Sequence, residues 1–236
     1  DWALKDDDYS NPYRSPYDFE RYVGNFRNEL IKFLIGRVVA AQCPNVNVEM
    51  VSLLSEIDKT IGEEAFDAKA IKTFLEGKFV ANAEALSIEH LMSQVEHLIP
   101  RFETKKEGES WGKRRPATVD DLVQGRKLIL DIWTYPTYSK GMEIHYEAPS
   151  HISALERAIQ IVLDKADPVT VSGDTALSGL VYANRSGCFR RVEYGGKHTE
   201  YARFYKNGKF ELAFKTEGKA RQVAAWIVEH LPKRDY

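Results

Sequence analysis

The sequence predicts an α+β protein, in which an N-terminal helical part is followed by an antiparallel meander sheet packed with helices. Three observations favour this class. Apolar residues recur at steps of three and four through residues 16–99, which is the period of amphipathic helices. Beyond about residue 170 the period changes to two, which is typical of strands. Asn207-Gly208 then joins two alternating runs, and this dipeptide indicates a tight β-hairpin because both turn residues need positive φ.

The helical part is expected to contain four helices, at about 16–42, 48–62, 67–76 and 87–99. Ser15-Pro16 supplies a cap and a first-turn proline, Pro44 ends the first helix and Gly77 ends the third. The stretch 103–117 is charged and aperiodic, which predicts a linker or mobile loop. The expected organisation is therefore a helical domain at 1–102 and an α+β domain at 118–236.

Within the α+β domain, hydroxyl-x-x-carboxylate caps predict helices from Thr118 to about Trp133 and from Ser153 to before Pro168. A turn and a short strand are expected between these helices. Alternating runs then predict strands at about 177–184, 188–194, 199–206 and 209–215. Thr216 caps a final helix. The last strand turns Phe210, Leu212 and Phe214 to the core.

Composition excludes several broad classes of function. The chain has 236 residues, 29% of them charged, and a net charge of −2, so any attraction to nucleic acid must be local. Cys43 and Cys188 lie far apart and form no CxxC pair, so neither a disulfide framework nor a zinc site of usual spacing is predicted. Apolar runs fall short of the roughly 18 residues of a membrane span. We expect a cytoplasmic protein without a membrane partner.

The segment SALERAIQIVL (153–163), the strands after it, the hairpin RFYKNGKFELAFKT (203–216, the KNG hairpin) and the final helix carry a family resemblance. They resemble the C-terminal part of an uncharacterised bacterial and phage domain family, whose members occur beside or fused to adenine-specific DNA methyltransferases on mobile elements. The family's hairpin reads aromatic-x-Lys-Asn-Gly-Asn-x-His-Leu-x-Phe. The positions that match it are Phe204, Lys206, Asn207, Gly208, Leu212 and Phe214.

Two positions depart from that pattern. Lys209 replaces the usual Asn and Glu211 replaces the usual His, so any chemistry that depends on this His is lost here. The resemblance covers about residues 155–231. It implies a phage or mobile-element setting connected with DNA modification or defence, and a methyltransferase or defence component as a protein partner.

One group of residues suggests catalysis. Glu143, His145 and Glu147 alternate along an expected strand and would point to one side, with His151 close after. Two carboxylates around an imidazole suit an acid–base set, or a metal site, in a hydrolase or transferase that acts on nucleic acid. An exposed edge strand that carries charges has the same sequence. His90 and His97 lie roughly 10 Å apart along a helix, too far to share one ion, and neither a metal nor a cofactor is predicted.

A stronger local signal is positive charge. Between Arg185 and Arg221 there are ten Lys or Arg against four Glu, with aromatic residues among them. Cations and rings on an open sheet face suit phosphates and unpaired bases. A solvated sheet face that lysines keep soluble would have the same sequence pattern. The folding of the hairpin gives no reason for cations at 203, 206, 209 and 215. The candidate nucleic-acid-binding residues are Arg190, Tyr201, Arg203, Tyr205, Lys206, Lys209 and Lys215.

The favoured interpretation is a phage or mobile-element protein that binds nucleic acid, preferably single-stranded, or a nucleic-acid-processing partner, without an enzymatic centre. The loop KKEGESWGKRRP (105–116), with five cations and Trp111, is a candidate second contact. One alternative is a hydrolase or transferase that uses the Glu/His group. The other is a protein-binding inhibitor of host defence that uses the aromatic first helix.

Overall fold

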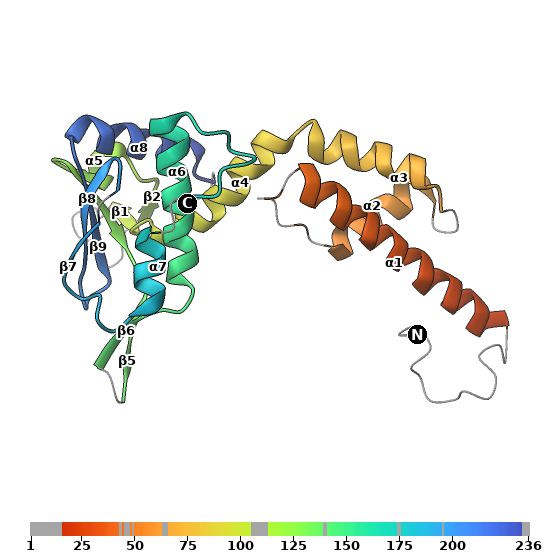
Figure 1. Ribbon diagram of the computed structural model, residues 1–236, viewed down its shortest axis with the longest axis horizontal. Coiled ribbons are helices and arrows are strands. Elements are labelled where there is room, and N and C mark those ends of the chain that lie inside the picture. Colours follow the sequence, from red (N-terminus) through yellow and green to blue (C-terminus); the bar gives the residue numbers. More distant parts are fainter. Residues whose placement is uncertain are drawn as a thin grey trace. The chain divides into compact units, whose positions relative to one another are not determined.

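The chain is an α+β protein, as predicted (Figure 1). The computed structural model describes residues 16–42, 44, 48, 50–62, 66–104, 113–138, 141–173, 176–194 and 196–232. Two compact units are formed, Asp1–Leu86 and Ser87–Tyr236. The division falls inside helix α4 (Ala83–Val95), earlier in the chain than the expected end of the helical domain at residue 102. In the described residues no helix is both long and apolar enough to span a membrane.

The first unit packs α1 (Pro16–Gln42), α2 (Met50–Ile61) and α3 (Ala68–Leu75), which continues as a π-helical turn, η1 (Glu76–Val80). Gly77 does not end the helical segment, contrary to the prediction, because it does not adopt the positive φ with which a glycine ends a helix. Gly62, which follows α2, does adopt it (φ 105°). The buried core residues are Ile31, Ile35, Val39, Leu53, Ile57, Ile71, Leu75 and Phe79.

Phe26 and Phe33 of α1 do not belong to this core. Phe26 is 52% exposed and Phe33 63% exposed. Arg27 lies on the inner face instead, where it donates hydrogen bonds of 2.7 Å to Asp58 and 2.8 Å to the carbonyl of Gly62. The guanidinium thus ties α1 to the end of α2, and the side chains of Phe26 and Phe33 stay on the surface.

The second unit is built on a five-stranded antiparallel sheet of order β3-β4-β9-β8-β7. The strands are β3 (Val123–Gln124), β4 (Lys127–Asp131), β7 (Arg191–Glu193), β8 (Thr199–Phe204) and β9 (Lys209–Phe214). Helices α6 (Ala148–Asp164), α7 (Ala176–Ala183) and α8 (Glu217–His230) lie on one side of it (Figure 1). The unit is therefore a helix layer on a sheet.

Alternating residues of the central strands fill the space between the two layers. Phe210, Leu212 and Phe214 of β9 are all fully buried, as predicted. Leu128 pairs with Leu212 and Leu130 with Phe210 across β4 and β9, so the same face of β4 is apolar. The predicted KNG hairpin is confirmed, with Gly208 at φ 89° in its turn.

Two predicted elements are wrong in type. The helix expected from 118 to 133 is limited to α5 (Val119–Leu122) and is followed by β3 and β4. Gly125, at φ 58°, makes the turn between these strands, and β4 gains its stability from pairing with β9 rather than from local helix propensity. The strand expected at 177–184 is helix α7, and α6 begins at Ala148, before the predicted start at Ser153.

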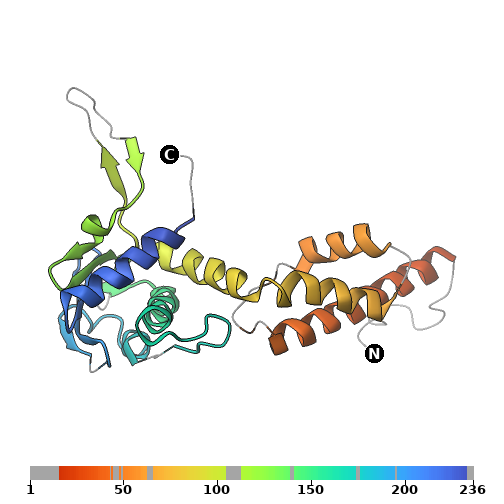
Figure 2. The same ribbon diagram turned by 90° about the horizontal axis from the view of Figure 1, so that it is seen from above.

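Two further hairpins belong to this unit. β1 (Phe102–Thr104) pairs with β2 (Lys113–Arg115), and β5 (Thr134–Thr137) pairs with β6 (Gly141–Ile144). Figure 2 shows β1 and β2 projecting away from α8 and the helix layer. Within the expected linker at 103–117, residues 103–104 and 113–115 are thus paired strands, while 105–112 with Trp111 lies outside the described residues.

Candidate nucleic-acid interface

The face of the five-stranded sheet opposite the helices carries most of the predicted binding residues. In an antiparallel sheet, residues paired across strands point to the same face. The register therefore sets Ile129, Glu211, Arg203 and Arg191 in one row, with parallel rows on either side. We call this surface the open sheet face, and its residues are Lys127, Ile129, Asp131, Arg191, Glu193, Tyr201, Arg203, Tyr205, Lys209, Glu211 and Ala213.

Arginine and tyrosine side chains are paired on the open sheet face. The guanidinium of Arg191 lies 4.0 Å from the ring centre of Tyr201, and that of Arg203 lies 4.8 Å from the ring centre of Tyr205. Lys209 Nζ lies 5.5 Å from the same Tyr205 ring. Both arginines are exposed, whereas the two tyrosines are half-buried. Each pair presents a guanidinium and a π-face together, and Arg191 Nε also lies 2.9 Å from the carboxylate of Glu193.

A buried carboxylate holds two of the cations. Glu211 is 3% exposed, and its carboxylate lies 2.7 Å from Lys209 Nζ and 3.1 Å from Lys127 Nζ. Burial alone would raise the pKa of Glu211, but the hydrogen bonds and positive charges of the two lysines outweigh it and the pKa lies below its ordinary value. Lys209 therefore has a structural reason to be in the hairpin, contrary to the expectation from the sequence. Lys127 was missed because its strand was predicted as helix.

The remaining predicted cations are exposed at the edges of this surface. Arg190 precedes β7, Lys206 lies in the KNG turn and Lys215 follows β9. Within the part of the chain that the structure describes, none of these three cations nor Arg203 forms an ion pair. These four side chains are thus available to an external anion, whereas Lys127 and Lys209 share Glu211.

An aromatic cluster that the sequence interpretation missed adjoins the KNG turn. Its residues are Trp133, Tyr135, His145 and Tyr146. The rings of Trp133 and His145 are stacked with centres 4.2 Å apart, and Tyr146 lies 4.3 Å from His145. Trp133 is 69% exposed and Tyr146 66% exposed. The run WTYPTY at 133–138, rich in rings beside a proline, is the signal that could have indicated an exposed aromatic hairpin.

Backbone contacts fix the cluster against the turn. Ile132 N donates to the carbonyl of Gly208 at 2.7 Å, and the hydroxyl of Thr134 donates to the carbonyl of Lys206 at 3.1 Å. The strand that follows Trp133 therefore begins beside the KNG turn. The aromatic cluster and the Tyr205 end of the open sheet face are neighbours.

Of the three candidate catalytic residues, His145 and Glu147 lie together, whereas Glu143 has other partners. Glu143 is 7% exposed, accepts a hydrogen bond of 3.2 Å from the Tyr135 hydroxyl and lies 3.6 Å from the guanidinium of Arg185. His145 follows β6, and its Nδ1 lies 3.6 Å from the carboxylate of Glu147, the residue before α6. Among the described residues, no three His, Cys, Asp or Glu side chains are placed to hold a metal ion.

The fold and the open sheet face define the class of this unit, a two-layer α+β unit with one uncovered sheet surface. Comparisons of the chain with protein-family models, with curated proteins and with solved structures find no match. The geometry of the surface is therefore what bears on its function.

Proposed function

We propose that the open sheet face binds nucleic acid, preferably single-stranded. The observation that supports this proposal best is the pair of arginine–tyrosine contacts, Arg191 with Tyr201 and Arg203 with Tyr205. A phosphate requires a cation, and an unpaired base requires a flat π-face. Each pair offers both within one side-chain contact.

The balance of charge on the surface favours unpaired bases over duplex. Four cations of the open sheet face stand against three carboxylates, those of Asp131, Glu193 and Glu211. Duplex DNA is bound mainly through many phosphates, which requires a strong positive excess. A surface with a small excess and exposed rings gains more from stacking, at about 1–3 kcal/mol per base.

The aromatic cluster extends the same surface past the KNG turn. Trp133 and Tyr146 are exposed, and each is in ring contact or stacking with His145. A nucleic acid strand that passes Tyr205 at the end of the open sheet face reaches these rings next, because Thr134 is hydrogen-bonded to Lys206. The proposed path therefore runs from β7 across β8 to the KNG turn and the cluster.

The proposed setting follows from the resemblance of the KNG hairpin. It is a phage or mobile-element protein of the cytoplasm, connected with DNA modification or defence. An adenine-specific DNA methyltransferase or a defence component is the proposed protein partner. Glu211 in place of the family's usual His supports binding rather than catalysis, because this carboxylate is buried between two lysines.

Fluorescence anisotropy with a labelled single-stranded oligonucleotide, and with its duplex, tests the proposal. The variant Arg191→Glu/Arg203→Glu should bind the single strand more than tenfold more weakly, and log affinity should fall with log salt by about 0.7 per phosphate contact. Lys69→Glu introduces the same charge at an exposed lysine of α3. Its affinity for the single strand should stay within about twofold of the parent's, because surface substitutions away from a site have small effects. Failure to bind at low salt, or indifference to the double reversal, would favour a protein-binding inhibitor instead.

A further inference from the structure

A separate cavity of about 310 Å³ lies in the second unit, at the base of the β1–β2 hairpin. We call it the arginine cavity. It is formed by the 3₁₀ turn η2 (Glu96–Leu98) and the segment after it, by β2, and by the end of α8. None of the residues of the open sheet face lines it. Its volume lies at the lower end of the range of small-molecule sites.

Three arginine residues line the arginine cavity, Arg101, Arg114 and Arg115. Arg101 and Arg114 are exposed, and neither forms an ion pair within the described residues. Glu96 is the one carboxylate in the lining. The cavity therefore has an excess of positive charge that its own walls do not neutralise.

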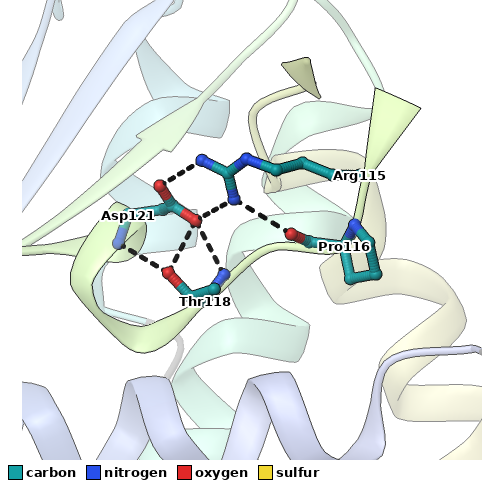
Figure 3. Close-up of polar contacts among 4 residues, drawn as sticks. All are labelled: Arg115, Pro116, Thr118 and Asp121. Atoms are coloured by element: carbon teal, nitrogen blue, oxygen red, sulfur yellow. Dashed lines mark hydrogen bonds and ion pairs between the residues drawn. The ribbon is translucent and has the colours of Figure 1, made fainter. Parts of the chain in front are cut away.

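Arg115 is fixed by a network at the base of the hairpin (Figure 3). Its two terminal nitrogens donate to the two oxygens of Asp121 at 2.5 and 2.6 Å, and one also donates to the carbonyl of Pro116 at 3.1 Å. Its guanidinium also lies 5.2 Å from the ring centre of Phe102. This rigid pair sets the position of β2 and hence of Arg114, the preceding residue.

Apart from His97, the rest of the lining is apolar. Ile99, Phe102, Ala117 and Leu231 contribute, together with the prolines at 100 and 232. Such a lining accommodates a flat apolar group, while the two unpaired arginines bind an anion beside it. A guanidinium offers a planar fork of donors that matches phosphate or carboxylate geometry.

We infer that the arginine cavity binds a small phosphate monoester that also carries a flat ring, such as a mononucleotide. A phosphate monoester carries about −1.5 to −2 charges at neutral pH, because its second pKa is near 6. Arg101 and Arg114, which form no ion pair within the described residues, match that dianion better than they match a carboxylate with one charge. This site is independent of the proposed nucleic-acid surface, since different elements build it.

Isothermal titration calorimetry on the full chain tests the inference with adenosine monophosphate, adenosine and inorganic phosphate. The monophosphate should bind at least tenfold more tightly than either fragment. The variant Arg101→Gln/Arg114→Gln should weaken its binding tenfold or more, and Arg191→Gln on the open sheet face should change it less than twofold. The reverse pattern would assign the nucleotide to the open sheet face and overturn the inference.

A second pair of ligands separates phosphate from carboxylate. Phenyl phosphate and benzoate carry the same ring, and phenyl phosphate should bind more tightly. Equal affinity would overturn the assignment of a phosphate monoester. The single variant Arg101→Gln, which lies outside the candidate second contact at 105–116, should retain binding of the single-stranded oligonucleotide, so failure at this cavity and failure at the open sheet face give different results. The circular dichroism spectrum of each variant should match that of the parent. A variant with a changed spectrum is replaced by Arg101→Lys/Arg114→Lys. This replacement should also weaken monophosphate binding, because an ammonium group lacks the planar fork of donors.

Discussion

The hydroxyl of Tyr194 donates a hydrogen bond of 2.7 Å to the carboxylate of Glu156, which is 2% exposed. The same carboxylate accepts hydrogen bonds from the amides of Leu177 at 2.8 Å and Ser178 at 3.3 Å, in the first turn of α7. A carboxylate is favourable at this end of a helix, where amides lack intrahelical partners. One side chain of α6 therefore holds both the start of α7 and the chain after β7.

Removal of this carboxylate should strongly destabilise the second unit. Glu156→Ala leaves several buried donors without an acceptor, and we expect a loss of about 2–4 kcal/mol in the free energy of unfolding. Glu156→Gln keeps one acceptor oxygen and should cost less. Urea unfolding followed by circular dichroism measures both changes, and equal costs for the two variants would contradict this account.

Acidification should weaken the anchor of the β1–β2 hairpin. The hydrogen bonds from Arg115 hold the pKa of Asp121 well below its ordinary value, with further contributions from Thr118. Because the folded pKa is depressed, this stabilisation is present above the unfolded pKa of roughly 3.9 and is lost as the pH falls through lower values. The difference in unfolding free energy between the parent and Asp121→Asn should therefore be constant near neutral pH and shrink below about pH 4. A difference that does not change with pH would show that the charge of Asp121 contributes nothing.

Gly208 should not tolerate a side chain. Its φ is 89°, and a Cβ atom there would lie 2.9 Å from the carbonyl oxygen of Ile132. We expect Gly208→Ala to cost more than about 1 kcal/mol in thermal or urea unfolding, from backbone strain and this contact together. Gly218→Ala is the matched control, because that glycine lies in α8 without positive φ and has open space around it. The control should be neutral or stabilising, by up to about 1 kcal/mol.

Trp133 should contribute to binding of single-stranded nucleic acid, and its fluorescence should change on binding. If a base stacks on its exposed ring, the oligonucleotide should quench tryptophan fluorescence, and Trp133→Ala should cost about 1–3 kcal/mol of binding free energy. Tyr182→Ala is a suitable control, since Tyr182 is an exposed ring of α7, which lies on the helix side of the sheet (Figure 1). Equal effects of the two substitutions in the anisotropy assay would remove the aromatic cluster from the interface.

The sequence by itself determined the α+β class and the KNG hairpin, because both depend on local patterns. Asn207-Gly208 fixes the turn, and strict alternation then places Phe210 with the core. The same alternation along β8 turns Tyr201, Arg203 and Tyr205 to a single face. That part of the candidate site could therefore be predicted from residue spacing alone.

Only the tertiary structure decided the elements that depend on contacts between segments far apart in the sequence. Residues 127–131 are a strand because their leucines pack with β9 across the sheet, and 176–183 are a helix whose first amides are bound by Glu156 from α6. Pairing of Lys127 of β4 with the buried Glu211 of β9 likewise joins strands far apart in sequence. Local propensities differ by less than about 1 kcal/mol per residue for most side chains. Burial of one large apolar side chain is worth about 1.5–3 kcal/mol, so packing overrides them.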